Sequence, residues 1–368
     1  GSEMCIRDRT YLMGGGDVDL FIGYGGRTKM DKRVDSNLLL DMSGMLNDIG
    51  FNLDDELGVA NMAEYHYDDG AVYGFPTKYE NSRWILINED MFKEAGLDIP
   101  YDGWTYSEFL ADAEKLTHGE GQDKVYGVCW ARKQSGKSIL YALDGVLGAN
   151  QIYKNEEGTE VNFDNDVYRA GLNLVKETLD KGYAIPIEDE FSEDISVANT
   201  FLQGKCAIML GVAQMRLCMD QENYPHDFMT ALVPAPVPDD EKYNTEFYRK
   251  QIGTTGAGDL LSISANTKYP EASFEFAMWY LKGGMSPLVQ GGRIPLWNGV
   301  NKDEVLSVLK EKAQGSIDMD SMENYLSLDT TQGVAAIKGN ASSEISSAWF
   351  EEFDAMCYGK QSVDQTVQ

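Results

Sequence analysis

Aromatic and polar side chains recur in this chain at the ends of short apolar runs, where a ligand could meet them. Ligands of α/β sheets bind beyond the carboxyl ends of the strands. Aromatic faces pack on the C–H faces of sugar rings, and amide, carboxylate and guanidinium groups pair with vicinal hydroxyls. Each aromatic could instead serve core packing. The candidate ligand-binding residues are the aromatics Tyr24, Tyr79, Trp84, Trp130 and Trp297 and the polar residues Glu80, Asn81, Arg132, Gln214 and Arg293.

The segment with the most candidate residues close together covers residues 74–88. A Gly-x-Pro turn signal opens it, and a polar run with Tyr79, Glu80 and Asn81 follows. The apolar run at 84–87 then predicts a buried strand. Polar groups on a segment that feeds into a core strand are well placed to hold a polar ligand. An ordinary loop followed by a strand and a helix would have the same pattern.

Other chemistries find little support in the sequence. A phosphate-binding loop at Gly136-Lys137-Ser138 would need a glycine where Ala131 stands. The three histidines are scattered along the chain, so we expect no zinc or haem site, no other metal and no cofactor. Adjacent carboxylates such as Asp54 and Asp55 could form a glycosidase pair, but in so acidic a chain most belong to a solvated face. We therefore assign no catalytic residue.

The composition narrows the class of protein further. A length of 368 residues favours two domains. The net charge of −29 argues against binding to nucleic acid or to an anionic membrane surface. Five cysteines without a paired spacing do not suggest a disulfide framework. No apolar run approaches the length of a membrane span, and residues 1–10 are interpreted as a non-native remnant rather than a signal peptide.

Strands and helices alternate along almost the whole chain, which is typical of an α/β protein. Thr105 and Glu108 predict a capping box at the start of one helix, and Trp104 and Phe109 are in position for a hydrophobic staple. Further strands are predicted at 19–23, 125–130, 206–210 and 229–233, and further helices at 166–181, with Asp164 as the cap, and at 270–281.

The order of several motifs resembles the extracellular solute-binding proteins of bacterial ABC importers, in the group that includes the maltose-binding protein. The resemblance covers roughly residues 11–365. The motifs that carry it are Tyr73-Gly74-Phe75-Pro76, Asn88-Glu89-Asp90-Met91-Phe92, Trp104-Thr105-Tyr106-Ser107-Glu108-Phe109, Phe201-Leu202-Gln203-Gly204-Lys205-Cys206-Ala207-Ile208-Met209, and Leu261 to Ala272 followed by Ile294-Pro295.

This resemblance implies a two-lobed, type II periplasmic-binding-protein-like fold of α/β class, with the lobes joined by crossover hinge segments. The crossovers are expected near 80–83, 255–259 and 320–330. The first strand, helix and strand of the family have no counterpart in the chain as given. The expected ranges are 11–80 and 259–322 for the N-terminal lobe, and 84–255 and 325–365 for the C-terminal lobe.

The resemblance also implies a function without bond breaking. An extracytoplasmic protein, periplasmic or held at the cell membrane as a lipoprotein, would capture a carbohydrate by lobe closure and deliver it to the permease of an ABC transporter. We expect an oligosaccharide ligand and a monomeric protein. Asn81 matches a frequent hydroxyl-binding position, Tyr24 lies on a frequent ligand loop, and Thr255 joins the candidates for hydrogen bonding. Gln214 stands where many relatives carry a stacking tryptophan, which leaves the identity of the sugar open.

Two alternatives stay open. An α/β enzyme that acts on carbohydrate, such as a glycoside hydrolase, would place two carboxyl groups about 5–9.5 Å apart in a cleft. A binding protein for another polar solute, such as a polyamine or a phosphodiester, would share the fold and differ in its ligand.

Overall fold

The chain divides into two compact units in the computed structural model. Unit 1 comprises Gly1–Glu80, Thr254–Val305 and Thr330–Ala335, and unit 2 comprises Asn81–Gly253, Leu306–Asp329 and Ala336–Gln368. The residues that the structure describes are 14, 17–23, 26–58, 65–67, 69–79, 84–130, 154–155, 159–192, 197–210, 215–249, 259–284, 286–327 and 342–368.

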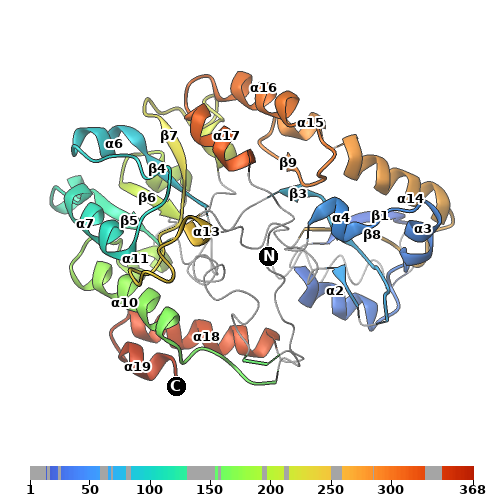
Figure 1. The fold of residues 1–368 in the computed structure, drawn as a ribbon, viewed down its shortest axis with the longest axis horizontal. Helices are drawn as coiled ribbons and strands as arrows, with labels where there is room; N and C mark the ends of the chain where they lie inside the picture. The colour runs from blue at the N-terminus through green and yellow to red at the C-terminus, as the bar shows by residue number, and fades with distance from the viewer. Residues whose placement is uncertain are drawn as a thin grey trace. The chain divides into compact units, whose positions relative to one another are not determined.

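A four-stranded mixed sheet forms the centre of unit 2 (Figure 1). One pair of neighbouring strands runs parallel and the other two pairs run antiparallel. Nearly every strand residue is buried, which explains why these segments are continuous apolar runs rather than alternating patterns. In spatial order the strands are β5 (Tyr126–Cys129), β6 (Cys206–Leu210), β4 (Trp84–Asn88) and β7 (Thr230–Pro234).

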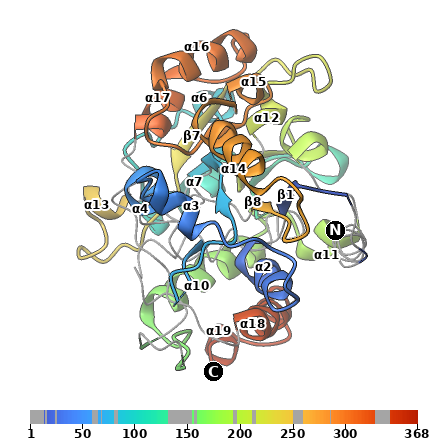
Figure 2. The ribbon, with the colours of Figure 1, turned by 90° about the vertical axis from the view of Figure 1, so that its right-hand side faces the viewer.

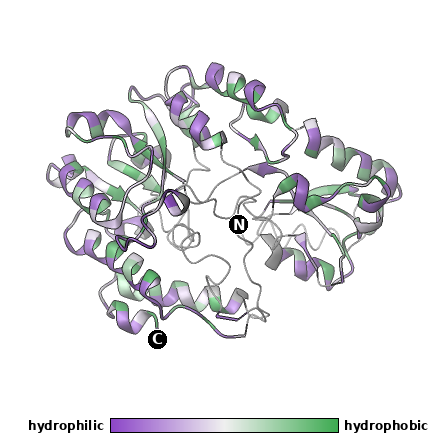
Figure 3. Ribbon diagram, in the orientation of Figure 1, coloured by the Kyte–Doolittle hydropathy of each residue, from purple (hydrophilic) through white to green (hydrophobic). Residues whose placement is uncertain are grey.

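Helices cover both faces of this sheet. On one face, Ile85 and Ile87 of β4 belong to the same buried cluster as Phe109, Leu172 and Trp349 from three helices. Figure 3 shows apolar strands beside helices that have an apolar and a polar side. The helices of this cluster are α7 (Tyr106–Leu116), α10 (Asp166–Asp180) and α18 (Ser342–Cys357). The remaining helical segments of unit 2 are α6 (Glu89–Glu94), η2 (Gly121–Asp123), α11 (Ile187–Ser192), η4 (Val197–Phe201), α12 (Met215–Cys218), α13 (Glu246–Arg249), α17 (Met319–Ser327) and α19 (Val363–Thr366).

Helix α17 packs on β7, so one predicted lobe range is wrong. The sequence prediction assigned residues up to 322 to the first lobe, whereas the structure places Leu306–Asp329 in unit 2. The hydroxyl of Ser321 accepts a hydrogen bond from the backbone N–H of Leu232 at 3.0 Å. This bond satisfies a backbone N–H group on an outer strand of the sheet of unit 2.

The start of α7 confirms the predicted capping box. The Thr105 hydroxyl accepts from the backbone N–H of Glu108 at 3.3 Å, and the Glu108 carboxylate accepts from the backbone N–H of Thr105 at 2.7 Å. The rings of Trp104 and Phe109 lie 5.0 Å apart, as a hydrophobic staple requires. All of these signals lie within six consecutive residues, so the start of this helix can be predicted from the local sequence alone.

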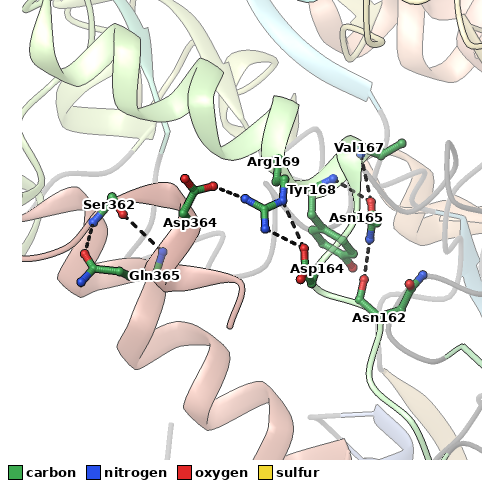
Figure 4. Close-up of polar contacts among 9 residues, drawn as sticks. All are labelled: Asn162, Asp164, Asn165, Val167, Tyr168, Arg169, Ser362, Asp364 and Gln365. Carbon is green, nitrogen blue, oxygen red and sulfur yellow. Dashed lines mark hydrogen bonds and ion pairs between the residues drawn. The ribbon is translucent and has the colours of Figure 1, made fainter.

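Helix α10 begins at Asp166, as predicted, but its cap is not the predicted Asp164. The N-cap is Asn165, whose side-chain oxygen accepts from the backbone N–H groups of Val167 and Tyr168 at 3.0 Å each. Asp164 instead binds Arg169 at 2.6 Å, and Arg169 also pairs with Asp364 of α19 (Figure 4). Asp164 is therefore an anchor for a surface ion network rather than a cap.

Replacing Asn165 with alanine should lower the free energy of unfolding by about 1 kcal/mol, because two N–H groups of α10 lose their acceptor. Urea denaturation followed by circular dichroism would measure the loss. Asn165→Ser keeps an acceptor and should cost about 0.5 kcal/mol or less. An equal loss in both variants would contradict a capping role.

Unit 1 contains two small antiparallel sheets. Helix α14 packs along β8 and helix α2 along β1, on either side of these strands (Figure 2). One sheet has the order β1 (Leu20–Gly23), β8 (Leu260–Ile263), β2 (Phe75–Pro76), and the other pairs β3 (Lys78–Tyr79) with β9 (Ile294–Pro295). The helical segments are α2 (Gly26–Val34), α3 (Ser43–Asp48), α4 (Leu53–Leu57), α14 (Pro270–Trp279), η6 (Tyr280–Gly284), α15 (Ser286–Val289) and α16 (Lys302–Ala313), the last of which extends into unit 2.

Candidate functional site

Three of the candidate residues gather on the small β3–β9 ladder of unit 1. Tyr79 pairs in register with Ile294, so Arg293 and Trp297 lie just before and just after the strand beside it. The backbone N–H of Leu296 donates to Thr77 at 3.0 Å and extends this pairing. The antiparallel pairing thus brings together residues that are more than 200 positions apart in the sequence.

Trp297 is held in one orientation by helix α4. Its indole N–H donates to the Glu56 carboxylate at 2.6 Å. The next residue, Asn298, donates to the backbone oxygens of Glu56 at 2.9 Å and Asp55 at 3.1 Å. A Cβ on Gly299 would lie 2.2 Å from the Trp297 ring, so the ring packs directly against that glycine. A partly exposed indole that is fixed in this way can stack on a ligand without losing further side-chain freedom.

Arg293 belongs to a small cluster of charges beside the same ladder. One oxygen of Asp259 lies 2.9 Å from the ammonium group of Lys78 and 3.9 Å from the Arg293 guanidinium. Lys78 thus neutralises Asp259 at close range, while the Arg293 side chain is 41% exposed. A guanidinium in this position can present its N–H groups to a hydroxyl pair or an anion.

Tyr79 is almost completely buried on the ladder. Most of its ring therefore contributes to the packing of unit 1. The structure brings it next to Arg293 and Trp297 but does not expose it as a stacking platform.

Trp84 and Trp130 both lie in the core of unit 2. Trp84 is 1% exposed, and its ring lies 5.3 Å from that of Tyr325 on α17. Trp130 donates its indole N–H to the hydroxyl of Thr178 at 2.9 Å, inside the cluster around Phe109. Core packing, the alternative open for every aromatic, therefore accounts for both residues, and we leave them out of the proposed site.

The other candidates cannot be placed. They lie outside the described residues and are Tyr24, Glu80, Asn81, Arg132, Gln214 and Thr255.

Two further properties bear on the chemistry of the described residues. Across the described ranges, no group of three or more His, Cys, Asp or Glu side chains is arranged to hold a metal ion. Within the same ranges, no helix is both long and apolar enough to cross a bilayer.

Glu56, Lys78 and Asp259 are the described residues of this site that the sequence analysis missed. Glu56 belongs to an acidic segment whose pattern is typical of a solvent-exposed helix face. Lys78 and Asp259 are ordinary charged residues next to short strands, and their contact joins positions far apart in the chain. No local pattern marks them, because their role depends on strand pairing.

The fold of the chain is that of the type II periplasmic-binding proteins, as solved structures show. A sugar transporter from Rhizobium etli in an open conformation is 19% identical, with a TM-score of 0.70 over 100% of this chain and 87% of that one. An ABC substrate-binding protein from Listeria monocytogenes in complex with cycloalternan is 16% identical, with a TM-score of 0.71 over 98% and 85%. UgpB from Mycobacterium tuberculosis in complex with glycerophosphocholine is 15% identical, with a TM-score of 0.68 over 100% and 85%.

Residues 8–282 match the family described as bacterial extracellular solute-binding protein. The chain belongs to this family, which confirms the resemblance and the fold class inferred from the motifs. No curated protein sequence matches the chain.

Proposed function

We propose that this solute-binding protein captures a carbohydrate, with an oligosaccharide as the expected ligand, and delivers it to the permease of an ABC importer. The observation that carries the proposal is the fixed, partly exposed indole of Trp297, with Arg293 at the other end of the same short strand β9. An aromatic face and a planar hydrogen-bond donor on one strand suit a sugar ring and its vicinal hydroxyls. Names of structural neighbours add support, since they include a chitin oligosaccharide binding protein and a cyclic α-maltosyl-1,6-maltose binding protein.

The proposed mechanism is capture by lobe closure, without a chemical step. A ligand that contacts both lobes stabilises the closed state by its differential affinity. In this proposal Tyr24 contributes to stacking, and the polar side chains contribute hydrogen bonds. The polar residues proposed outside the described ranges are Glu80, Asn81, Arg132, Gln214 and Thr255. We also propose that the protein acts as a monomer outside the cytoplasm, with expected crossovers near 80–83 and 255–259.

Isothermal titration calorimetry against a panel of solutes tests the proposal. The panel would contain malto-oligosaccharides, chito-oligosaccharides, cyclic glucans, spermidine and glycerophosphocholine. We expect one or more oligosaccharides to bind, with a stoichiometry of about one for the site that contains Trp297. Binding of glycerophosphocholine or spermidine alone would replace the carbohydrate with another polar solute. Turnover of a glycoside during the titration would favour the enzyme alternative.

Replacing Trp297 with alanine should weaken carbohydrate binding about tenfold, because a stacking face is lost. Calorimetry with the best ligand of the panel would measure the change. Trp279→Ala is the matched control, since Trp279 is an exposed tryptophan of the same unit on α14. The control should bind like the unmodified protein. Equal affinities of the Trp297→Ala and Trp279→Ala variants would contradict a role for Trp297 in stacking.

A further inference from the structure

A pocket lies in unit 1 beside helix α4, and Asp54 of that helix lines it. Its volume is about 340 Å³, and its walls come from α3, α4 and the segment around residues 65–72. Gly50 and Gly70 line its mouth with positive φ angles of 64° and 80°, and no atom lies within 4 Å of where their Cβ atoms would be. The pocket is therefore open to solvent.

The floor of the pocket is apolar. Leu46, Phe51 and Leu53 line it and are buried. Among the described residues that line the pocket there is no lysine or arginine, and the ammonium group of Lys282 lies 4.6 Å from the centre of the Phe51 ring. With a carboxylate in the wall and a net charge of −29, an anionic ligand is unfavourable here.

A carboxylate is fixed in the wall. One oxygen of Asp54 accepts hydrogen bonds from the Tyr65 hydroxyl at 2.8 Å and from the His66 ring at 2.7 Å. Burial raises the pKa of Tyr65, and the hydrogen bond and negative charge of Asp54 raise it further. The phenol therefore keeps its proton and remains a donor. The second oxygen of Asp54 has no hydrogen-bond partner among the described residues, so it can accept from a ligand.

Amide groups complete the polar side of the pocket. The side-chain oxygen of Asn52 caps α4 by accepting from the backbone N–H groups of Asp54 at 2.9 Å and Asp55 at 3.4 Å. This assigns the amide orientation and leaves the NH₂ group of Asn52 as a donor. Asn47 adds a second amide at the exposed rim. In the described part of unit 1, neither amide NH₂ group has a protein partner.

We infer that this pocket binds a single neutral sugar ring. A fixed carboxylate oxygen and two amide donors match a set of ring hydroxyls, and the apolar floor matches the C–H face of the ring. The volume is at the lower end of the range for small-molecule sites, about 300–1,000 Å³. The ring could be a free monosaccharide or the terminal unit of a longer glycan. This site goes beyond the ligand proposed for the β3–β9 ladder and does not depend on it.

Saturation-transfer difference NMR with the full chain tests the inference. The probes are the methyl glycosides of glucose, galactose and mannose, together with a maltotetraose and choline. At least one sugar probe should receive saturation in its ring protons. Signals from the methyl glycosides would identify a monosaccharide site, and signals from the terminal unit of the tetrasaccharide alone would identify a glycan end. Saturation of choline alone, or of no probe, would overturn the inference.

Two variants locate the signal. Asp54→Asn removes the charged acceptor but keeps the side-chain shape, so affinity for the sugar probe should fall about tenfold. Asp55→Asn is the matched control, because Asp55 is the next residue of α4, is exposed and does not line the pocket. Its affinity should stay within about twofold. Equal losses in both variants would overturn the assignment to this pocket.

The same variants distinguish a failure of this inference from a failure of the proposed function. Binding that depends on Trp297 and not on Asp54 would support the proposed function and overturn this inference. Binding that depends on Asp54 and not on Trp297 would support the inference alone. Thermal unfolding of each variant shows whether unit 1 remains folded, and Tyr65→Phe provides a second variant that removes a hydrogen bond to Asp54 with little change in volume.

Discussion

Replacing Phe109 with alanine should lower the free energy of unfolding of unit 2 by about 3–5 kcal/mol. Phe109 is fully buried at the point where α7 meets the central sheet. Its ring lies 5.0 Å from that of Trp104 and 5.6 Å from that of Trp130. Alanine would remove the transfer free energy of a phenyl ring and leave a cavity that these rigid neighbours cannot fill.

Urea denaturation followed by tryptophan fluorescence is the appropriate measurement. Four of the six tryptophans, Trp84, Trp104, Trp130 and Trp349, lie in unit 2 and report mainly on its unfolding. Phe276→Ala is the matched control, since Phe276 lies on α14 of unit 1 and is 50% exposed. The control should change stability by about 1 kcal/mol or less. Similar losses for the two variants would show that Phe109 is not a centre of the core.

The sequence predicted those parts of the fold whose signals are local. The capping box at Thr105 and Glu108 lies within a few residues of the helix that it starts, and the apolar runs of unit 2 fall on its buried strands. The cap of α10 shows the limit of such signals. Asp164 and Asn165 are both good N-cap residues, and the choice between them depends on Arg169, which holds Asp164 and pairs with Asp364 almost 200 residues away.

The predicted lobe range that ended at 322 was wrong for a related reason, because it included the start of α17. Its place on β7 is set by the bond between Ser321 and Leu232 and by a bridge between Ile317 and Thr230, which join segments about 90 residues apart. A periodic pattern in the sequence identifies the apolar side of a helix, but it does not say which of two sheets that side will cover.

Whether an aromatic candidate lies in the core or at the surface depends on contacts with residues far away in the sequence. Trp84 and Trp297 each follow or begin a strand-like segment, and both are plausible stacking residues in the sequence. In the structure, Tyr325 encloses Trp84 in the core, whereas Glu56 holds Trp297 at the surface of α4 from 241 positions away. The sequence therefore predicts which residue types could bind a sugar, and strand pairing decides which of them are available.

Replacing Asp259 with alanine should lower the stability of unit 1 by about 2–4 kcal/mol, somewhat less than for a fully buried pair. The side chains of Lys78 and Asp259 are only 19% and 12% exposed, so the ammonium group would lose its carboxylate partner in a site largely shielded from water. Asp48→Ala is the matched control, because Asp48 is an exposed residue at the end of α3 and should change stability by about 0.5 kcal/mol or less.

A double-mutant cycle separates the ion pair from simple loss of packing. The double variant combines Asp259→Ala with Lys78→Met, so no ammonium group at position 78 is left without its carboxylate. Its loss of stability should therefore be about 1–3 kcal/mol smaller than the sum of the losses of the two single variants. Thermal and urea unfolding of the four proteins give the coupling free energy. Additive losses would mean that the pair contributes no specific attraction. A coupled result would show that this ion pair ties β3 to the start of β8 and so fixes the ladder that carries Arg293 and Trp297.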